Sequence, residues 1–109
     1  LHGAPFILLD EPTTYLDLSH QLEVLELLKE LNKTNGVSII MVLHDLNLAS
    51  RYSDYLLAMG NGEIYAYGEP EDVFTNEMLE HCFGIEGEIA LSKVGKPLLL
   101  SYDLMGKHE

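Results

Sequence analysis

Basic residues, cysteine and long hydrophobic runs are scarce in this sequence of 109 residues. It has 6 Lys and Arg against 18 Asp and Glu, which gives a formal net charge of -12. This balance is the opposite of the basic surface that binds a nucleic-acid backbone or an anionic lipid surface. We therefore expect neither nucleic acid nor an anionic membrane surface as a direct binding partner.

Other absences narrow the class of protein further. The single cysteine, Cys82, excludes an internal disulfide, which favours a reducing compartment. No apolar run approaches the roughly 20 residues of a membrane-spanning helix, so we expect no direct insertion into a membrane. The sequence also lacks G-x-x-x-x-G-K-[ST], the glycine-rich loop whose amides and lysine bind phosphates. The remaining composition, 47% hydrophobic and 22% charged, is typical of a globular domain.

The first half of the chain has the pattern of a strand, a helix and a strand. Phe6–Leu9 and Val37–Leu43 are apolar runs that fit strands buried on both faces. Between them, apolar residues recur at three- and four-residue steps from about Leu18 to Thr34, which predicts a helix that Asp17 or Ser19 caps. Such a βαβ unit has parallel strands.

Polar residues follow both predicted strands directly. Asp10 and Glu11 come after the first strand, and His44 comes after the second. Because parallel strands place their carboxyl ends on the same edge of a sheet, where open α/β sheets bind ligands, we expect these three side chains to converge. Asp45 then predicts the cap of a helix from Leu46 to about Ser53.

The second half predicts hairpins and short helices. Residues 55–67 read as a β-hairpin around Gly60-Asn61-Gly62, since Asn-Gly supplies the positive φ angles of a tight turn. Pro70 opens a short helical stretch, and Asn76 is a candidate cap for another helix that runs to about Cys82. Two further strands are predicted over residues 88–91 and 97–102.

A strand that ends in Asp-Glu suits nucleotide hydrolysis. The first carboxylate can hold the water shell of Mg²⁺, and the second can orient or deprotonate an attacking water. His44 can donate or accept a hydrogen bond near neutral pH, so it suits contact with a γ-phosphate. The alternatives are that Glu11 is merely solvated, that Asp10 caps the loop and that His44 caps or satisfies the strand edge.

The ordered motifs resemble those of ATP-binding-cassette (ABC) ATPases. The segment from Phe6 to Asp17 looks like the Walker B strand and the D-loop of that family, and Val42–Leu46 resembles its switch-histidine segment, the H-loop. Most of Leu46–Phe74 is similar to importer ATPases, in particular the iron–siderophore, haem and cobalamin uptake group. From Ile85 onward the resemblance is loose.

This resemblance implies an α/β fold that is part of the P-loop NTPase fold of ABC ATPases. A parallel βαβ core would be followed by a β-hairpin, short helices and a small C-terminal β element. Residues 1–83 would form the C-terminal part of the nucleotide-binding domain, with the Walker B, D-loop and H-loop motifs. Residues 84–109 would form an accessory β element and a tail.

The family also implies a role for each matching residue. Asp10 would bind Mg²⁺ through water, Glu11 would be the catalytic base, and His44 would contact the γ-phosphate, so all three would belong to the ATP site. Asp17 would close the D-loop, which in the family crosses the interface between two nucleotide-binding subunits. A helix N-cap is the other role open to Asp17, and the two roles are compatible.

The implied partners are a second copy of the ATPase subunit and transmembrane permease subunits. The intact subunit would lie in the cytoplasm, peripheral on the inner face of the cell membrane, and would use ATP and Mg²⁺ to power import of an iron–siderophore or a related metal chelate. The substrate is a family analogy, because importers select it through other subunits.

The glycine-rich loop, the glutamine loop and the Leu-Ser-Gly-Gly-Gln signature of the family are all missing, and all three precede Walker B in the family. We therefore expect the C-terminal part of a subunit, cut ahead of Leu1, that alone neither binds ATP tightly nor hydrolyses it. We also expect an unpaired apolar edge on strand 37–43, which favours dimers or aggregates of the isolated chain.

Two alternatives remain open. One is the head fragment of a soluble DNA-maintenance ATPase of the ABC type, although such heads lack the pattern seen from Gly62 to Phe74. The other is a stand-alone regulatory or interaction domain derived from an ABC ATPase, against which the intact Asp10, Glu11 and His44 argue.

Overall fold

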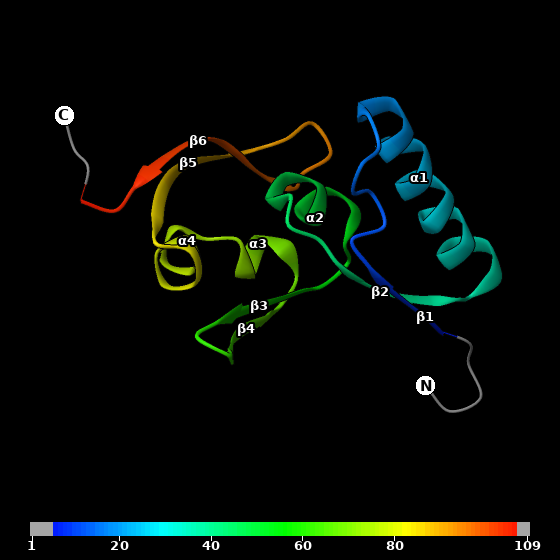
Figure 1. Ribbon diagram of the computed structural model, residues 1–109, viewed down its shortest axis with the longest axis horizontal. Helices are drawn as coiled ribbons and strands as arrows, with labels where there is room; N and C mark the ends of the chain where they lie inside the picture. The colour runs from blue at the N-terminus through cyan, green and yellow to red at the C-terminus, as the bar shows by residue number, and fades with distance from the viewer. Residues whose placement is uncertain (1–5, 107–109) are drawn as a thin grey trace. The chain divides into compact units, whose positions relative to one another are not determined.

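The computed structural model describes residues 6–106, and its chain forms two compact units, Leu1–His44 and Asp45–Glu109 (Figure 1). Leu1, where we expected a cut end, lies outside the described residues, as do the last three residues of the tail. Each unit is described by itself.

The first unit is the predicted βαβ unit. Strand β1 (Phe6–Asp10) leads through a loop to helix α1 (Leu18–Asn35), which returns the chain to strand β2 (Ser38–Val42). The two strands pair in parallel, with Phe6 opposite Ser38 and Asp10 opposite Val42. The prediction of two parallel strands that end at the same edge is confirmed.

Both ends of α1 follow from local sequence. The Asp17 carboxylate accepts a hydrogen bond from the backbone N–H of His20, so Asp17 rather than Ser19 is the N-cap. The helix ends at Gly36, whose φ of 67° lies in the left-handed region that glycine adopts without strain.

The β1–β2 pair is less buried than its apolar sequence predicts. Alternate side chains of both strands are exposed, namely Phe6 at 53%, Leu8 at 67%, Ile40 at 50% and Val42 at 47%. Helix α1 is the helix of this unit, and it packs against β2. The expectation of strands buried on both faces is therefore wrong for the described residues, because no second layer covers the other face.

The second unit begins with helix α2 (Leu46–Tyr52), capped by Asp45 as predicted. Strands β3 (Leu56–Gly60) and β4 (Glu63–Gly68) then form the predicted antiparallel hairpin. Asn61 and Gly62 in its turn have φ angles of 55° and 78°, as a tight turn of this kind requires.

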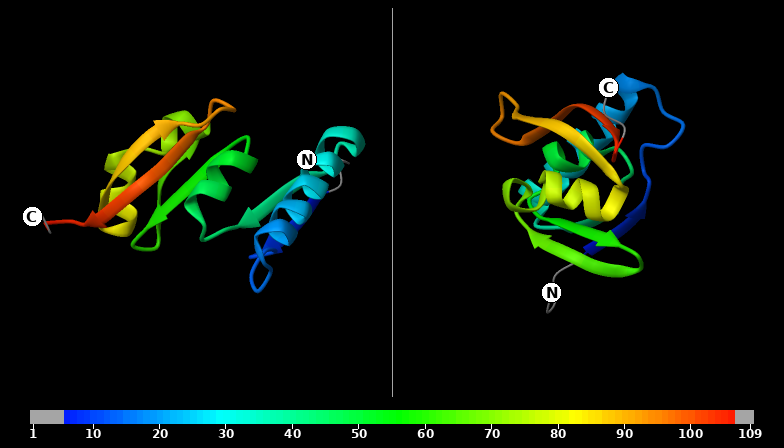
Figure 2. Two further views of the ribbon diagram at one scale, coloured as in Figure 1. Left: turned by 90° about the horizontal axis from the view of Figure 1, so that it is seen from above. Right: turned by 90° about the vertical axis from the view of Figure 1, so that its left-hand side faces the viewer.

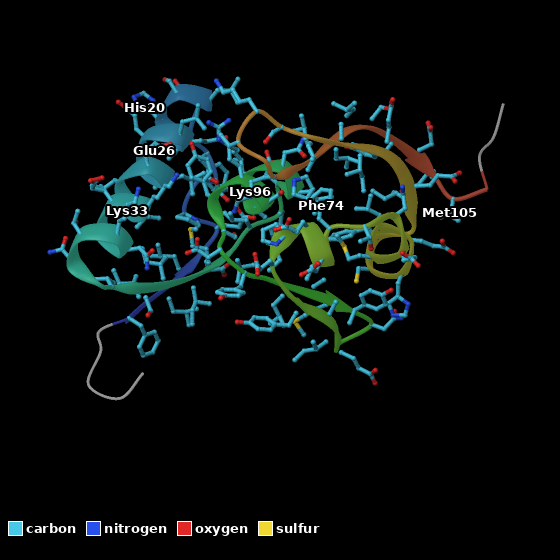
Figure 3. The ribbon with its side chains drawn as sticks, turned by 180° about the vertical axis from the view of Figure 1, so that it is seen from behind. His20, Glu26, Lys33, Phe74, Lys96 and Met105 are labelled. Carbon is cyan, nitrogen blue, oxygen red and sulfur yellow. The ribbon has the colours of Figure 1, made fainter. Side chains whose placement is uncertain are left out.

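Two short helices and a second hairpin complete this unit. Helices α3 (Pro70–Val73) and α4 (Asn76–Phe83) precede strands β5 (Ile85–Leu91) and β6 (Pro97–Leu104), which pair antiparallel. Figure 2 shows the β5–β6 hairpin running alongside α4. The core of the unit lies between these elements and consists of Phe74, Met78, Leu79 and Leu99 (Phe74 is labelled in Figure 3).

The cap of α4 differs from the prediction. Thr75, not Asn76, is the N-cap, and its hydroxyl accepts a hydrogen bond from the N–H of Met78. The Asn76 amide oxygen instead accepts from the N–H of Gly87 in β5, at 2.9 Å. The Asn76 side chain, which the sequence predicted as the cap of α4, therefore forms a tertiary contact with β5 instead.

Side chains of α2 fasten the second hairpin to the rest of its unit. The Asn47 amide both donates to the carbonyl of Leu99 and accepts from its N–H, at 3.1 and 2.7 Å. The buried Ser50 hydroxyl donates to the carbonyl of Pro97 at 2.7 Å. The Lys96 ammonium group donates to the carbonyl of Ser53 at 2.6 Å (Figure 3). The predicted boundary between residues 1–83 and 84–109 stays a prediction.

No helix within residues 6–106 combines the length and apolar character needed to cross a membrane.

Cys82 packs against the core of the second unit, and desolvation by burial raises the pKa of its thiol. The thiol is therefore a weaker nucleophile at neutral pH than an exposed cysteine.

Candidate active site

The candidate site lies in the first unit, at the carboxyl ends of β1 and β2. Glu11 follows β1 and donates its backbone N–H to the carbonyl of Val42, the last residue of β2, at 2.9 Å. Its φ is 52°, in the left-handed region. This conformation turns the chain out of the strand at the point where the sequence places the second carboxylate.

Of the three side chains predicted to converge, the structure brings Glu11 and His44 into contact. One carboxylate oxygen of Glu11, Oε1, accepts a hydrogen bond from the backbone N–H of His44 at 2.5 Å. The imidazole Nε2 of His44 lies 3.6 Å from the same oxygen. The Glu11 side chain is 21% exposed and that of His44 is 81% exposed. The imidazole is therefore accessible to a ligand, while the carboxylate is held against the strand end.

A third residue, Thr14, contacts the same carboxylate. Its hydroxyl donates to the second oxygen of Glu11, Oε2, at 3.1 Å. The backbone N–H of Thr14 also donates to the carbonyl of Glu11 at 3.3 Å, which closes a turn. The sequence interpretation missed Thr14 and the backbone amide of His44. A hydroxyl three residues after Glu11 was a signal in the sequence that could have predicted the Thr14 contact.

The side chain of Asp10 is more exposed than that of Glu11. Asp10 ends β1 opposite Val42 and its side chain is exposed. Within residues 6–106, its carboxylate makes no hydrogen bond or ion pair that would neutralise it. An unpaired Asp10 carboxylate next to the hydrogen-bonded Glu11 carboxylate fits a Mg²⁺ ion that keeps most of its waters. Mg²⁺ prefers oxygen ligands and gives up water reluctantly.

Asp17 lies at the far end of the loop that begins at Glu11. Besides capping α1, its Oδ1 lies 2.7 Å from Nδ1 of His20 (Figure 3 labels His20 at the start of α1). Its side chain is 68% exposed, so the cap leaves the carboxylate accessible. The helix-cap role of Asp17 is thus confirmed, and the predicted role at a subunit interface stays a prediction.

The loop between Glu11 and Asp17 contains backbone strain. Glu11 and Tyr15 are non-glycine residues with φ angles of 52° and 71°. Such conformations cost about 1–3 kcal/mol each and concentrate at functional sites. The turn hydrogen bond from Leu16 to Thr13, at 3.2 Å, and the bond from the Gln21 amide to the carbonyl of Leu16, at 2.9 Å, maintain them.

Together, these residues offer an accessible carboxylate for a hydrated cation, a second carboxylate that can accept a proton, and an accessible imidazole. This set fits ATP and Mg²⁺ chemistry, in which most of the catalysis is positioning and charge stabilisation. The described residues contain no glycine-rich phosphate loop.

No protein-family model matches the chain. Curated relatives do match it. The iron(3+)-hydroxamate import ATP-binding protein FhuC of Bacillus subtilis (strain 168) is 48% identical over 104 residues, which are 94% of this chain and 39% of that protein. The petrobactin import ATP-binding protein FpuC of Bacillus anthracis is 57% identical over 83 residues, 76% of this chain and 30% of that protein.

A third relative is the ferric enterobactin transport ATP-binding protein FepC of Escherichia coli (strain K12). It is 47% identical over 95 residues, 86% of this chain and 35% of that protein. The chain therefore spans between 30% and 39% of the length of these three relatives.

Solved structures share the fold. A chain of a metal-chelate type ABC transporter in an inward-facing conformation superposes with a TM-score of 0.69 and 27% identity, covering 88% of this chain and 40% of that one. A part of the ABC transporter complex CbiONQ from Clostridium perfringens superposes with a TM-score of 0.59 and 34% identity. The match covers 68% of this chain and 30% of that one. The chain has the fold of the ABC ATPases. It is similar to ATP-binding subunits of siderophore and hemin import, and it is consistent with the C-terminal part of such a subunit.

Proposed function

We propose that this chain is part of a subunit that hydrolyses ATP to power an ABC importer of an iron–siderophore or a related metal chelate. The observation that carries the proposal is the contact between Glu11 and His44 at the carboxyl ends of two parallel strands. The names of the relatives support the import of iron chelates.

Each residue has a distinct role in this proposal. Asp10 holds Mg²⁺ through water, Glu11 accepts a proton from the attacking water, and His44 donates a hydrogen bond to the γ-phosphate. Bound Mg²⁺ supplies neutralisation of the phosphate charge. The accessible imidazole, 81% exposed, suits contact with a nucleotide, and the held Glu11 carboxylate suits proton transfer at a fixed place.

The proposal extends to partners and location. Asp17, exposed in the D-loop, contributes to an interface with a second copy of the ATPase subunit. Transmembrane permease subunits carry the substrate, and the ATPase lies in the cytoplasm against the inner face of the membrane. The names of the relatives, which describe ATP-binding proteins of import or transport systems, support the pairing with permease subunits.

The 109-residue chain alone is proposed to be inactive. It has the Walker B and H-loop residues but lacks the glycine-rich loop that binds the phosphates. Without that loop, ATP has too few contacts to be held near Glu11.

The test uses the whole subunit that contains this chain and the variant Glu11→Gln. We expect Glu11→Gln to lower kcat by at least about 100-fold, because general-base catalysis contributes on this order. Glu30→Gln is the matched control: Glu30 is exposed in the second half of α1 and is not among the candidate site residues, and its replacement leaves kcat unchanged.

The 109-residue chain is assayed beside the whole subunit, with MgATP turnover as the readout. A whole subunit that keeps its turnover with Glu11→Gln contradicts the role of Glu11. Turnover by the chain alone that Glu11→Gln abolishes contradicts its proposed inactivity.

A further inference from the structure

We propose that Thr14 is a positioning residue for Glu11. Its hydroxyl and the backbone amide of His44 together hold the Glu11 carboxylate in one orientation. This inference rests on the proposed function, in which Glu11 accepts a proton from water.

The two donors contact different oxygens of the carboxylate and come from different parts of the chain. The N–H of His44, 33 residues along the chain, donates to Oε1, and the hydroxyl of Thr14, three residues along, donates to Oε2. The terminal torsion of a glutamate is broad, so one donor leaves the carboxylate free to rotate about it. Two donors on opposite oxygens restrict that rotation.

The Thr14 hydroxyl is separable from the fold of its loop. The turn is closed by backbone hydrogen bonds, from the N–H of Thr14 to the carbonyl of Glu11 and from Leu16 to Thr13. The side chain of Thr14 is itself exposed. Replacing the hydroxyl by a methyl group in Thr14→Val therefore removes one contact with the carboxylate and leaves the backbone hydrogen bonds of the turn in place.

The expected effect is on the chemical step and not on nucleotide binding. A proton acceptor works only while it is oriented toward the water that it deprotonates, and small misplacements are costly. In the whole subunit we expect Thr14→Val to lower kcat by about 3–10-fold, the effect of losing one exposed hydrogen bond of ordinary strength, with KM for MgATP unchanged. Thr14→Ser keeps the hydroxyl and restores kcat.

A second readout needs no nucleotide. Hydrogen exchange of the His44 amide, followed by mass spectrometry over residues 38–46 of the nucleotide-free subunit, reports how firmly the carboxylate is held. We expect Thr14→Val to speed this exchange about threefold and Glu11→Ala to speed it further, because Glu11→Ala removes the acceptor. Tyr15→Phe is the matched control in both assays, since Tyr15 is in the same loop and its side chain is 100% exposed.

The outcomes separate this inference from the proposed function. If Glu11→Gln abolishes turnover while Thr14→Val changes neither kcat nor the exchange of His44, Thr14 does not position Glu11 and the proposed function stands. If Thr14→Ser is as impaired as Thr14→Val, the hydroxyl is not the active group and the inference is wrong. If Glu11→Gln has no effect, the proposed function fails first.

Discussion

Gly87 occupies a position in β5 where a larger residue would crowd its neighbours. A Cβ atom there would lie 2.5 Å from Cδ1 of Leu99 in the core and 3.0 Å from the backbone carbonyl oxygen of Ser101. The first distance is shorter than real Cβ atoms show, so the Leu99 side chain would have to shift, and the second is tighter than nine in ten real Cβ contacts, to a backbone atom that does not move aside cheaply. Close packing of β5 on β6 therefore depends on glycine at this one residue.

We expect Gly87→Ala to lower the free energy of unfolding by about 1–3 kcal/mol, the usual cost of forcing extra volume into packed structure. Gly68→Ala is the control, because a Cβ atom there meets its nearest neighbour, Cγ2 of Val73, at an ordinary 3.5 Å. Urea unfolding of the two variants beside the unchanged chain measures the difference. Equal midpoints for the two variants would contradict the packing argument.

At the residue scale, predictions held where the cause is local. Asp17 and Asp45 cap the helices that follow them, and Asn61-Gly62 forms the tight turn, because each depends on neighbours within a few residues. The cap of α4 was predicted wrongly at Asn76, whose amide is used by the distant Gly87. The contact of Thr14 with Glu11 was missed although it is local, and only the His44 amide on the other carboxylate oxygen gives it a positioning role.

At the element scale, side chains fasten β6 to helix α2. The N–H and carbonyl of Leu99 point away from β5 and pair with the amide of Asn47 at 2.7 and 3.1 Å. Asn47 thus takes the place of a neighbouring strand. Such side-chain cover also protects the strand edge from pairing with another chain.

Asn47→Ala is expected to cost about 1–3 kcal/mol of stability, because it leaves a part-buried N–H and carbonyl without partners. The rate of hydrogen exchange of the Leu99 amide should rise as stability falls, because this amide loses its acceptor. Asn47→Asp, which keeps an acceptor for the N–H but loses the donor to the carbonyl, should fall between Asn47→Ala and the unchanged chain. Protection of Leu99 that survives Asn47→Ala would show that β6 is held otherwise.

At the scale of the whole molecule, the described residues form three two-stranded sheets and no larger one. Large apolar side chains remain exposed on β1 and β2, and a two-stranded sheet has unpaired edges. Such edges are templates for pairing with another chain.

We expect the isolated chain to dimerise or aggregate through β2. Light scattering at concentrations where the chain is folded should give a mass above the monomer's 12.2 kDa. Ile40→Lys places a charge on the half-exposed side chain at the middle of β2 and should lower that mass, whereas Leu57→Lys, on the equally exposed β3, should lower it less. A monomeric mass for the unchanged chain would contradict this prediction.

The sequence by itself determined the order and type of the elements, the parallel βαβ unit and the convergence of Glu11 and His44 at one sheet edge. These follow from periodicity, caps and the geometry of parallel strands, which are short-range causes. Only the tertiary structure decided which oxygen of Glu11 meets Thr14 and which meets His44, that Asn76 serves β5, and that Asn47 serves β6. The hydrogen bonds of His44, Asn76 and Asn47 join residues that are 11 to 52 positions apart in the sequence, and local propensity carries no information about such pairings.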